Sequence, residues 1–213
     1  MELISLFFLS FGVGFSGAMM PGPLLAVGIA ETPRHGWQTG PVISIGHAIA
    51  EIGVVVLLAL GVAAVAQHPT VTSTISIVGG VALVLMGATM AIDILRGRVN
   101  YDSQADKPKG GHRLLMGKGI TASLSNPYWF VWWATTGLAF VTKSLEFGFI
   151  GPIVFYFGHI MSDFVWFSLV SALLWQGKRL IMGTGLKVLI LACAAFLVFL
   201  GISFFIDGIT EIS

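Results

Sequence analysis

The sequence has few charged residues and almost no cysteine, and both shortages narrow the class of protein. Asp, Glu, Lys and Arg make up 10% of the 213 residues, whereas 56% are hydrophobic. Soluble domains carry about 25% charged residues, so this composition predicts an integral membrane protein. The single cysteine, Cys193, cannot form an internal disulfide, which excludes a dithiol electron carrier acting alone. We expect the lipid bilayer as a partner, no nucleic acid and no cofactor.

The apolar residues gather into segments long enough to cross a bilayer, which takes roughly 20 residues for about 30 Å of hydrocarbon. The N-terminus lacks the basic region of a signal peptide, so we expect the first segment to be retained. The only substantial polar stretch is 96–118, where Pro108 and Gly110–Gly111 should interrupt any helix. Six spans are predicted, at 3–30, 40–66, 71–95, 119–142, 147–175 and 183–207.

The basic residues lie almost entirely on one side of this predicted topology. Of the 11 Lys and Arg residues, Lys143 alone falls on the opposite side. Basic residues in short loops mark the cytoplasmic side. The distribution therefore predicts a multi-pass protein of the cell (plasma) membrane with both termini outside. The residues on the cytoplasmic side are Arg34, Arg96, Arg98, Lys107, Lys109, Arg113, Lys118, Lys178, Arg179 and Lys187.

Two segments resemble each other, "GPVISIGHAIAEIGVVVLLAL" at 40–60 and "GPIVFYFGHIMSDFVWFSLVSALL" at 151–174. Each opens with Gly-Pro and reaches Gly-His, and an acidic residue follows the His by four positions. The span before each segment also carries a helix breaker. We therefore interpret 1–95 and 119–213 as two three-helix repeats joined by the cytoplasmic loop 96–118. Because three is odd, the second repeat enters from the opposite side, an inverted topology typical of secondary transporters.

The helix breakers lie in the first and fourth predicted spans. Pro21 and Pro23 flank Gly22, and Asn126 precedes Pro127. Proline removes an amide donor and strains the helix. Backbone groups freed within a membrane are tolerated only where protein buries them or a watery cavity receives them. Paired breaks in corresponding spans favour a substrate site over two structural kinks.

The two His–acid pairs are the main candidates for chemistry. Residues at i and i+4 share a helix face, so His47 lies over Glu51 and His159 over Asp163. Both acids fall in the middle third of their spans, where an ionisable group costs at least a few kcal/mol and faces the protein interior or a pathway. Inverted symmetry would bring the pairs together. Such a cluster could carry a proton or bind a solute amine, or it could fasten helices through buried hydrogen bonds.

The same four residues also suit a metal. Two His and two carboxylates are ligand types for zinc or manganese. A divalent cation held by His47, Glu51, His159 and Asp163 therefore stays an alternative to a proton or an amine.

The aromatic run "NPYWFVWWATTG" at 126–137 leaves two alternatives. Trp and Tyr favour membrane interfaces, so Tyr128, Trp129, Trp132 and Trp133 could form an interfacial belt. They could instead line a substrate cavity.

Two stretches resemble the LysE-type translocators, small six-helix exporters of amino acids and related solutes. They are "SGAMMPGPLLAVGIAETPRHGWQTGPVISIG" at 16–46 and "GITASLSNPYWFVWW" at 119–133. The Pro-Gly-Pro and the glycines at 36, 40 and 46 match the family's pattern, as does Asn126-Pro127. Many of its amino-acid exporters have Lys after Asn-Pro, where this chain has Tyr128.

The resemblance implies export of a small solute, an amino acid or a derivative, driven by the membrane potential or the proton gradient. In this hypothesis Glu51 and Asp163 carry the proton or pair with an amine, His47 and His159 tune them, and the breaks supply backbone ligands and hinges. A divalent metal-cation exporter is the alternative. An intramembrane enzyme is disfavoured because no nucleophile–base arrangement is recognisable. A homodimer is compatible with these features, although none of them specifies one.

Overall fold

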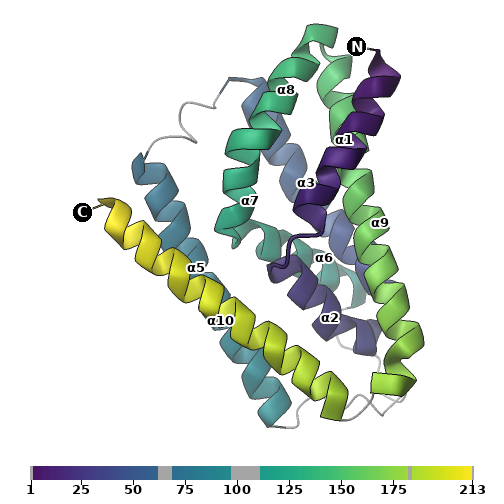
Figure 1. Cartoon of the computed structure of the whole chain (residues 1–213), viewed down its shortest axis with the longest axis vertical. Helices are drawn as coiled ribbons and strands as arrows, with labels where there is room; N and C mark the ends of the chain where they lie inside the picture. Colours follow the sequence, from purple (N-terminus) through teal and green to yellow (C-terminus); the bar gives the residue numbers. More distant parts are fainter. Residues whose placement is uncertain (1, 62–68, 97–110, 182–183, 213) are drawn as a thin grey trace.

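The computed structural model describes residues 2–61, 69–96, 111–181 and 184–212, which are helical almost throughout (Figure 1). No strand occurs among the residues of these four ranges. A helix satisfies its backbone hydrogen bonds internally, as a segment surrounded by lipid must. The structure therefore confirms the predicted all-α architecture.

Five of the six predicted spans have counterparts in the structure. Four helices are long and apolar enough to cross a membrane unaided: Thr39–Ala59 (α3), Ser73–Leu95 within α5 (Pro69–Leu95), Ile150–Gly177 within α9 (Ile150–Ile181) and Lys187–Thr210 within α10 (Thr184–Ile212). A fifth consists of α1 (Leu3–Ala18) and α2 (Pro23–His35), which meet at a bend of 78°. The bend falls at the predicted Pro-Gly-Pro break, since Pro23 is the first residue of α2 and has no amide hydrogen to donate.

The predicted fourth span, 119–142, is not confirmed as a continuous span, because the chain divides it. Helix α6 (Gly111–Leu124) ends before Asn126, and α7 (Pro127–Trp132) begins at Pro127. The Asn126 side-chain oxygen accepts a hydrogen bond from the Tyr128 amide at 3.1 Å, which caps α7. A π-helix, η1 (Trp133–Gly137), then leads into α8 (Leu138–Ser144) and a short 3-10 turn, η2 (Leu145–Phe147).

The expected polar loop is shorter than its predicted bounds of 96–118. Helix α6 begins at Gly111, so residues 111–118 are helical rather than loop. Gly111 has a φ of +49° and stands at the helix start, where its conformational freedom turns the chain without interrupting the helix. Residues 97–110 of the predicted loop and 62–66 of the predicted second span lie outside the described residues.

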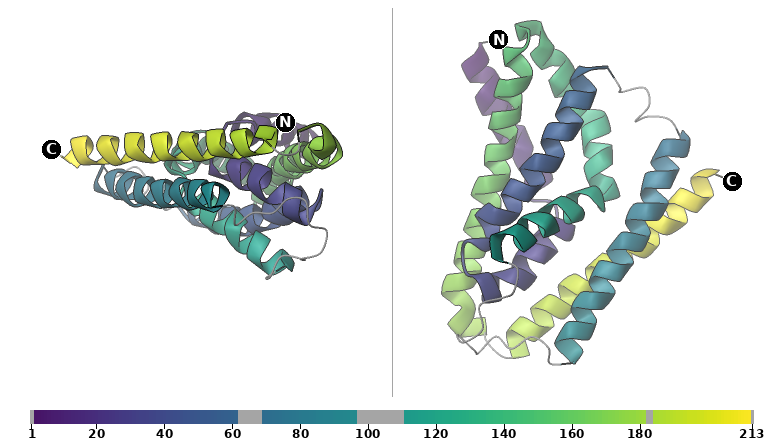
Figure 2. Two further views of the ribbon diagram at one scale, coloured as in Figure 1. Left: turned by 90° about the horizontal axis from the view of Figure 1, so that it is seen from below. Right: turned by 180° about the vertical axis from the view of Figure 1, so that it is seen from behind.

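Helices from the first half of the chain pack against helices from the second half. Helix α1 packs along α9, α3 packs along both α6 and α9, and α5 pairs with α10 (Figures 1 and 2). The glycine of each Gly-His dipeptide lies against the opposite part. A Cβ at Gly46 would strike the Met116 backbone in α6, and one at Gly158 would strike the Phe7 carbonyl in α1. The two glycines therefore allow the helices that carry His47 and His159 to pack closely.

Helices α5 and α10 meet along an antiparallel seam of small residues. Gly80 faces Gly201, Gly87 faces Ala194 and Gly208 faces Ser73, so the contacts recur every seven residues with opposite chain direction. Small residues let helix backbones approach closely in a membrane. Figure 1 shows the pair lying side by side at one edge of the other helices.

Adding one methyl group to this seam should destabilise the protein. A Cβ at Gly201 would lie 2.6 Å from the Gly80 carbonyl oxygen and 2.8 Å from a Val84 methyl, and the backbone carbonyl cannot turn away. Overpacking of this kind costs about 1–3 kcal/mol. We expect Gly201→Ala to lower the thermal unfolding temperature in detergent by several degrees. Gly53→Ala is the matched control, because nothing lies within 4 Å of a Cβ there. Equal unfolding temperatures of the two variants would contradict close packing along the seam.

Candidate functional site

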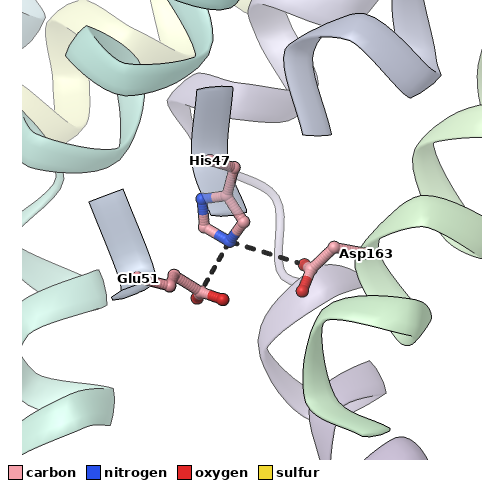
Figure 3. Close-up of side chains that lie close together, drawn as sticks. All are labelled: His47, Glu51 and Asp163. Carbon is pink, nitrogen blue, oxygen red and sulfur yellow. Dashed lines mark ion pairs between the residues drawn. The ribbon is translucent and has the colours of Figure 1, made fainter. Parts of the chain in front are cut away.

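Helices α3 and α9 bring both predicted His–acid pairs into one buried cluster. His47 and Glu51 come from α3, and His159 and Asp163 come from α9. Their exposed fractions are 7%, 1%, 3% and 2%, respectively. Figure 3 shows the His47 ring directed between the two carboxylates. We call these four residues the His–acid cluster.

Glu51 is the centre of the cluster, and one of its oxygens takes all its contacts. The Oε1 atom lies 3.0 Å from His47 Nε2 and 3.2 Å from His159 Nε2. It also accepts hydrogen bonds from the indole nitrogens of Trp129 at 3.3 Å and Trp133 at 3.2 Å. The second oxygen, Oε2, is buried without a hydrogen-bond partner among the described residues. Glu51 is therefore firmly positioned and still has one free acceptor.

The contacts of His47 show where one proton lies. The Ser123 hydroxyl donates to the Gly119 carbonyl at 2.8 Å, so its oxygen accepts from His47 Nδ1 at 2.6 Å and that nitrogen carries a hydrogen. The other nitrogen, Nε2, faces Glu51 Oε1 at 3.0 Å. Two lone pairs would repel at that distance, so a proton lies between them, on the imidazole or on the carboxyl group. The cluster thus holds a proton between His47 and Glu51.

Asp163 is the least engaged member of the cluster. Its Oδ1 lies 3.6 Å from His47 Nε2 and its Oδ2 lies 3.9 Å from His159 Nε2, both too long for good hydrogen bonds. Asp163 Oδ2 and His159 Nδ1 have no hydrogen-bond partner among the described residues. Buried polar atoms are normally satisfied, so these atoms and Glu51 Oε2 keep unused hydrogen-bonding capacity.

The aromatic run lies in the interior rather than forming only an interfacial belt. Trp129 is 9% exposed and Trp133 is 1% exposed, while Tyr128 at the start of the run is 46% exposed. The His159 ring stacks on Trp132 with centroids 4.6 Å apart and planes at 26°. Tyr128, Trp129, Trp132 and Trp133 all line one cavity, so the alternative of cavity lining holds for the whole set. The hydrogen bonds from Trp129 and Trp133 to Glu51, and the one between His47 and Ser123, were not predicted from the sequence.

A cavity of about 250 Å³ lies beside the cluster, and both helix breaks contribute to its wall. A Cβ at Gly22 would lie 3.5 Å from Asn126 Nδ2, so the two breaks are neighbours. All the predicted site residues line this central cavity except Pro23 and Pro127. Those two prolines begin α2 and α7 and so determine where the broken helices start.

The site also has donors for a metal ion. One ligand atom each from His47, Glu51 and Asp163 lie within 4.8 Å of one another. An imidazole nitrogen and two carboxylate oxygens suit zinc or manganese. His159 Nε2 contacts Glu51 Oε1 and therefore lies next to these ligand atoms.

Removing one indole donor should weaken the cluster. We expect Trp133→Phe to cost about 1.5–3 kcal/mol of stability, because it deletes a hydrogen bond to a buried charged group. Thermal unfolding in detergent measures the loss. Trp37→Phe is the matched control, since Trp37 is 52% exposed. If both variants unfold like the parent protein, the indole does not support Glu51.

Comparison with known proteins identifies the family. A family model described as LysE type translocator matches residues 15–208, far more than half of the chain. Neither a curated protein nor a solved structure gives a match. The chain therefore belongs to the LysE type translocator family, whose members are membrane exporters rather than enzymes.

Proposed function

We propose that the protein exports a small solute, an amino acid or a derivative, in exchange for protons, and that the central cavity is its transport site. The observation that carries the proposal is the His–acid cluster in the wall of a cavity that two broken helices enclose. Glu51 and Asp163 lie close to the middle of the apolar segments Thr39–Ala59 and Ile150–Gly177. Ionisable residues at such a depth mark ion and substrate pathways.

The cavity offers separate places for the two charges of an amino acid. The free oxygens Glu51 Oε2 and Asp163 Oδ2 can accept hydrogen bonds from an ammonium group. Helix α2 begins in the cavity wall and has no side-chain cap, so its first amides and the positive end of its dipole can receive a carboxylate. A volume of about 250 Å³ suits a small solute.

Proton exchange follows from the bond between His47 and Glu51. An ammonium group that arrives at Glu51 competes with the proton on His47 for the same carboxylate. Solute binding therefore favours proton release, and solute departure favours proton return. This coupling is what an exchanger needs.

Interleaved packing supports an inverted repeat and alternating access. The contacts of Gly46 with α6 and of Gly158 with α1 are equivalent under exchange of the two halves, as is the Gly80–Gly201 contact. We propose that the units 1–95 and 119–213 rock against each other around the central cavity. We place both termini outside and the protein in the plasma membrane, on the asymmetry of the basic residues.

Neutralising the acids tests the transport site. In liposomes loaded with labelled amino acids, we expect Glu51→Gln and Asp163→Asn each to lower proton-driven release at least tenfold, because the exchangeable proton or the amine contact is lost. Glu146→Gln removes an exposed acid of η2 and should release solute like the parent protein. Unchanged proton-linked release in the Glu51→Gln/Asp163→Asn double variant would refute the assignment.

A divalent-cation exporter is the second candidate, and the convergence of donor atoms from His47, Glu51 and Asp163 favours it. If the cargo is a metal, purified protein should bind about one equivalent of Zn²⁺ or Mn²⁺, and His47→Ala/His159→Ala should lose it. Isothermal calorimetry measures the stoichiometry. His112→Ala is the control, because His112 lies at the start of α6 and is exposed. Metal binding that survives in the double variant would remove this alternative.

A further inference from the structure

A second cavity of about 230 Å³ lies near the opposite end of α2. Helices α2, α5 and α6 supply its polar wall, and its apolar wall includes Ile190 of α10. The polar wall consists of Glu31, Arg34, Thr89, Asp93, Lys118 and Thr121. No function assigned above uses this second cavity.

Helix α2 connects the two cavities. Leu24 and Leu25 line the central cavity, whereas Val27 and Ala30 line the second one. Between them, Ala26 packs against Leu83 of α5 and Leu197 of α10, and these three side chains are 3%, 0% and 0% exposed. We call Ala26, Leu83 and Leu197 the apolar layer. Since a helix rises about 1.5 Å per residue, this layer is only one or two turns thick.

The charges of the second cavity differ in how they are engaged. Glu31 pairs with Lys118 at 2.5 Å and with His35 at 3.2 Å, which ties α2 to α6. Among the residues that the structure describes, none pairs with the Arg34 guanidinium. An arginine beside a cavity binds carboxylates in a bidentate manner. Arg34 therefore provides a site for the carboxylate of a solute.

The remaining polar groups suit an amine. The hydroxyls of Thr89 and Thr121 donate to carbonyls of their own helices, so their oxygen lone pairs face outward as acceptors. Acceptors beside a single available guanidinium fit a zwitterion better than a simple cation, which Arg34 would repel.

We propose that the second cavity is a loading site, in which an amino-acid zwitterion binds before the apolar layer opens toward the central cavity. The inference rests on the proposed export function and assigns its first step to residues outside the His–acid cluster. Arg34 and Lys118 belong to the side that the basic residues mark as cytoplasmic. An exporter must collect its solute from that side.

Protection of an introduced thiol tests the loading site. In a Cys193→Ala background, Thr89→Cys places a thiol in the wall of the second cavity, and a charged methanethiosulfonate reagent labels it in detergent. The probe is a mixture of glycine, leucine, lysine and phenylalanine. We expect labelling to slow roughly tenfold when the concentration is about ten times Kd, because the free fraction falls as 1/(1 + [L]/Kd). The amides of the same amino acids lack the carboxylate and should not protect.

Matched variants isolate the site. Thr74 lies fifteen residues earlier in α5, is exposed, and makes the same hydroxyl-to-carbonyl bond as Thr89, so labelling of Thr74→Cys should not respond to the mixture. Arg34→Gln should abolish protection at Thr89→Cys, and Arg34→Lys should restore part of it. Thr121→Cys in α6 repeats the test if Thr89→Cys does not fold. Labelling that ignores the mixture, or protection that persists in Arg34→Gln, would overturn the proposal.

The loading site and the transport site can fail separately. In the Glu51→Gln/Asp163→Asn double variant, we expect protection at Thr89→Cys to persist while release from liposomes is lost. Protection that disappears in this variant would overturn an independent loading site. If protection persists and release persists too, the loading site stands and the transport role of the His–acid cluster falls.

Discussion

The central interaction of this protein is the convergence of four side-chain nitrogens on one oxygen of Glu51. An isolated carboxylate inside a membrane protein would be costly, and His47, His159, Trp129 and Trp133 together offset that cost. These nitrogens come from α3, α9, α7 and η1, so the contacts on Glu51 hold both halves of the chain in register. Moving α9 or the aromatic segment would break them.

The two helix breaks also position groups around Glu51 and the cavity beside it. Because Asn126–Pro127 ends α6 and starts α7, the segment after the break directs the indoles of Trp129 and Trp133 at Glu51. The break at Pro21–Pro23 places the start of α2 beside the same cavity. The other end of α2, which carries Arg34, lies at the second cavity. One bent segment thereby contributes to both cavities, and its Ala26 packs against Leu83 and Leu197.

The helical spacing and the repeat were enough to predict the cluster. His47 and Glu51 share a face in any helix, and the Gly-His repeat indicated that α3 and α9 would meet. The indole donors could not be predicted in this way, because their direction depends on how α7 and η1 rotate after the break. The continuous fourth span was expected from hydropathy, which does not register a capped break at Asn126. The second cavity joins residues from α2, α5 and α6 that no sequence pattern links.

The antiparallel seam of α5 and α10 also has an electrical consequence. Each helix carries a macrodipole equivalent to about half a charge at either end, and the opposite directions of the two helices cancel these dipoles. If the pair is displaced across the membrane, the two dipoles therefore contribute almost no net work against the membrane potential. Any voltage dependence of export would then arise from charged side chains and from the charge of the solute, and its sign would reveal the net charge moved in each cycle.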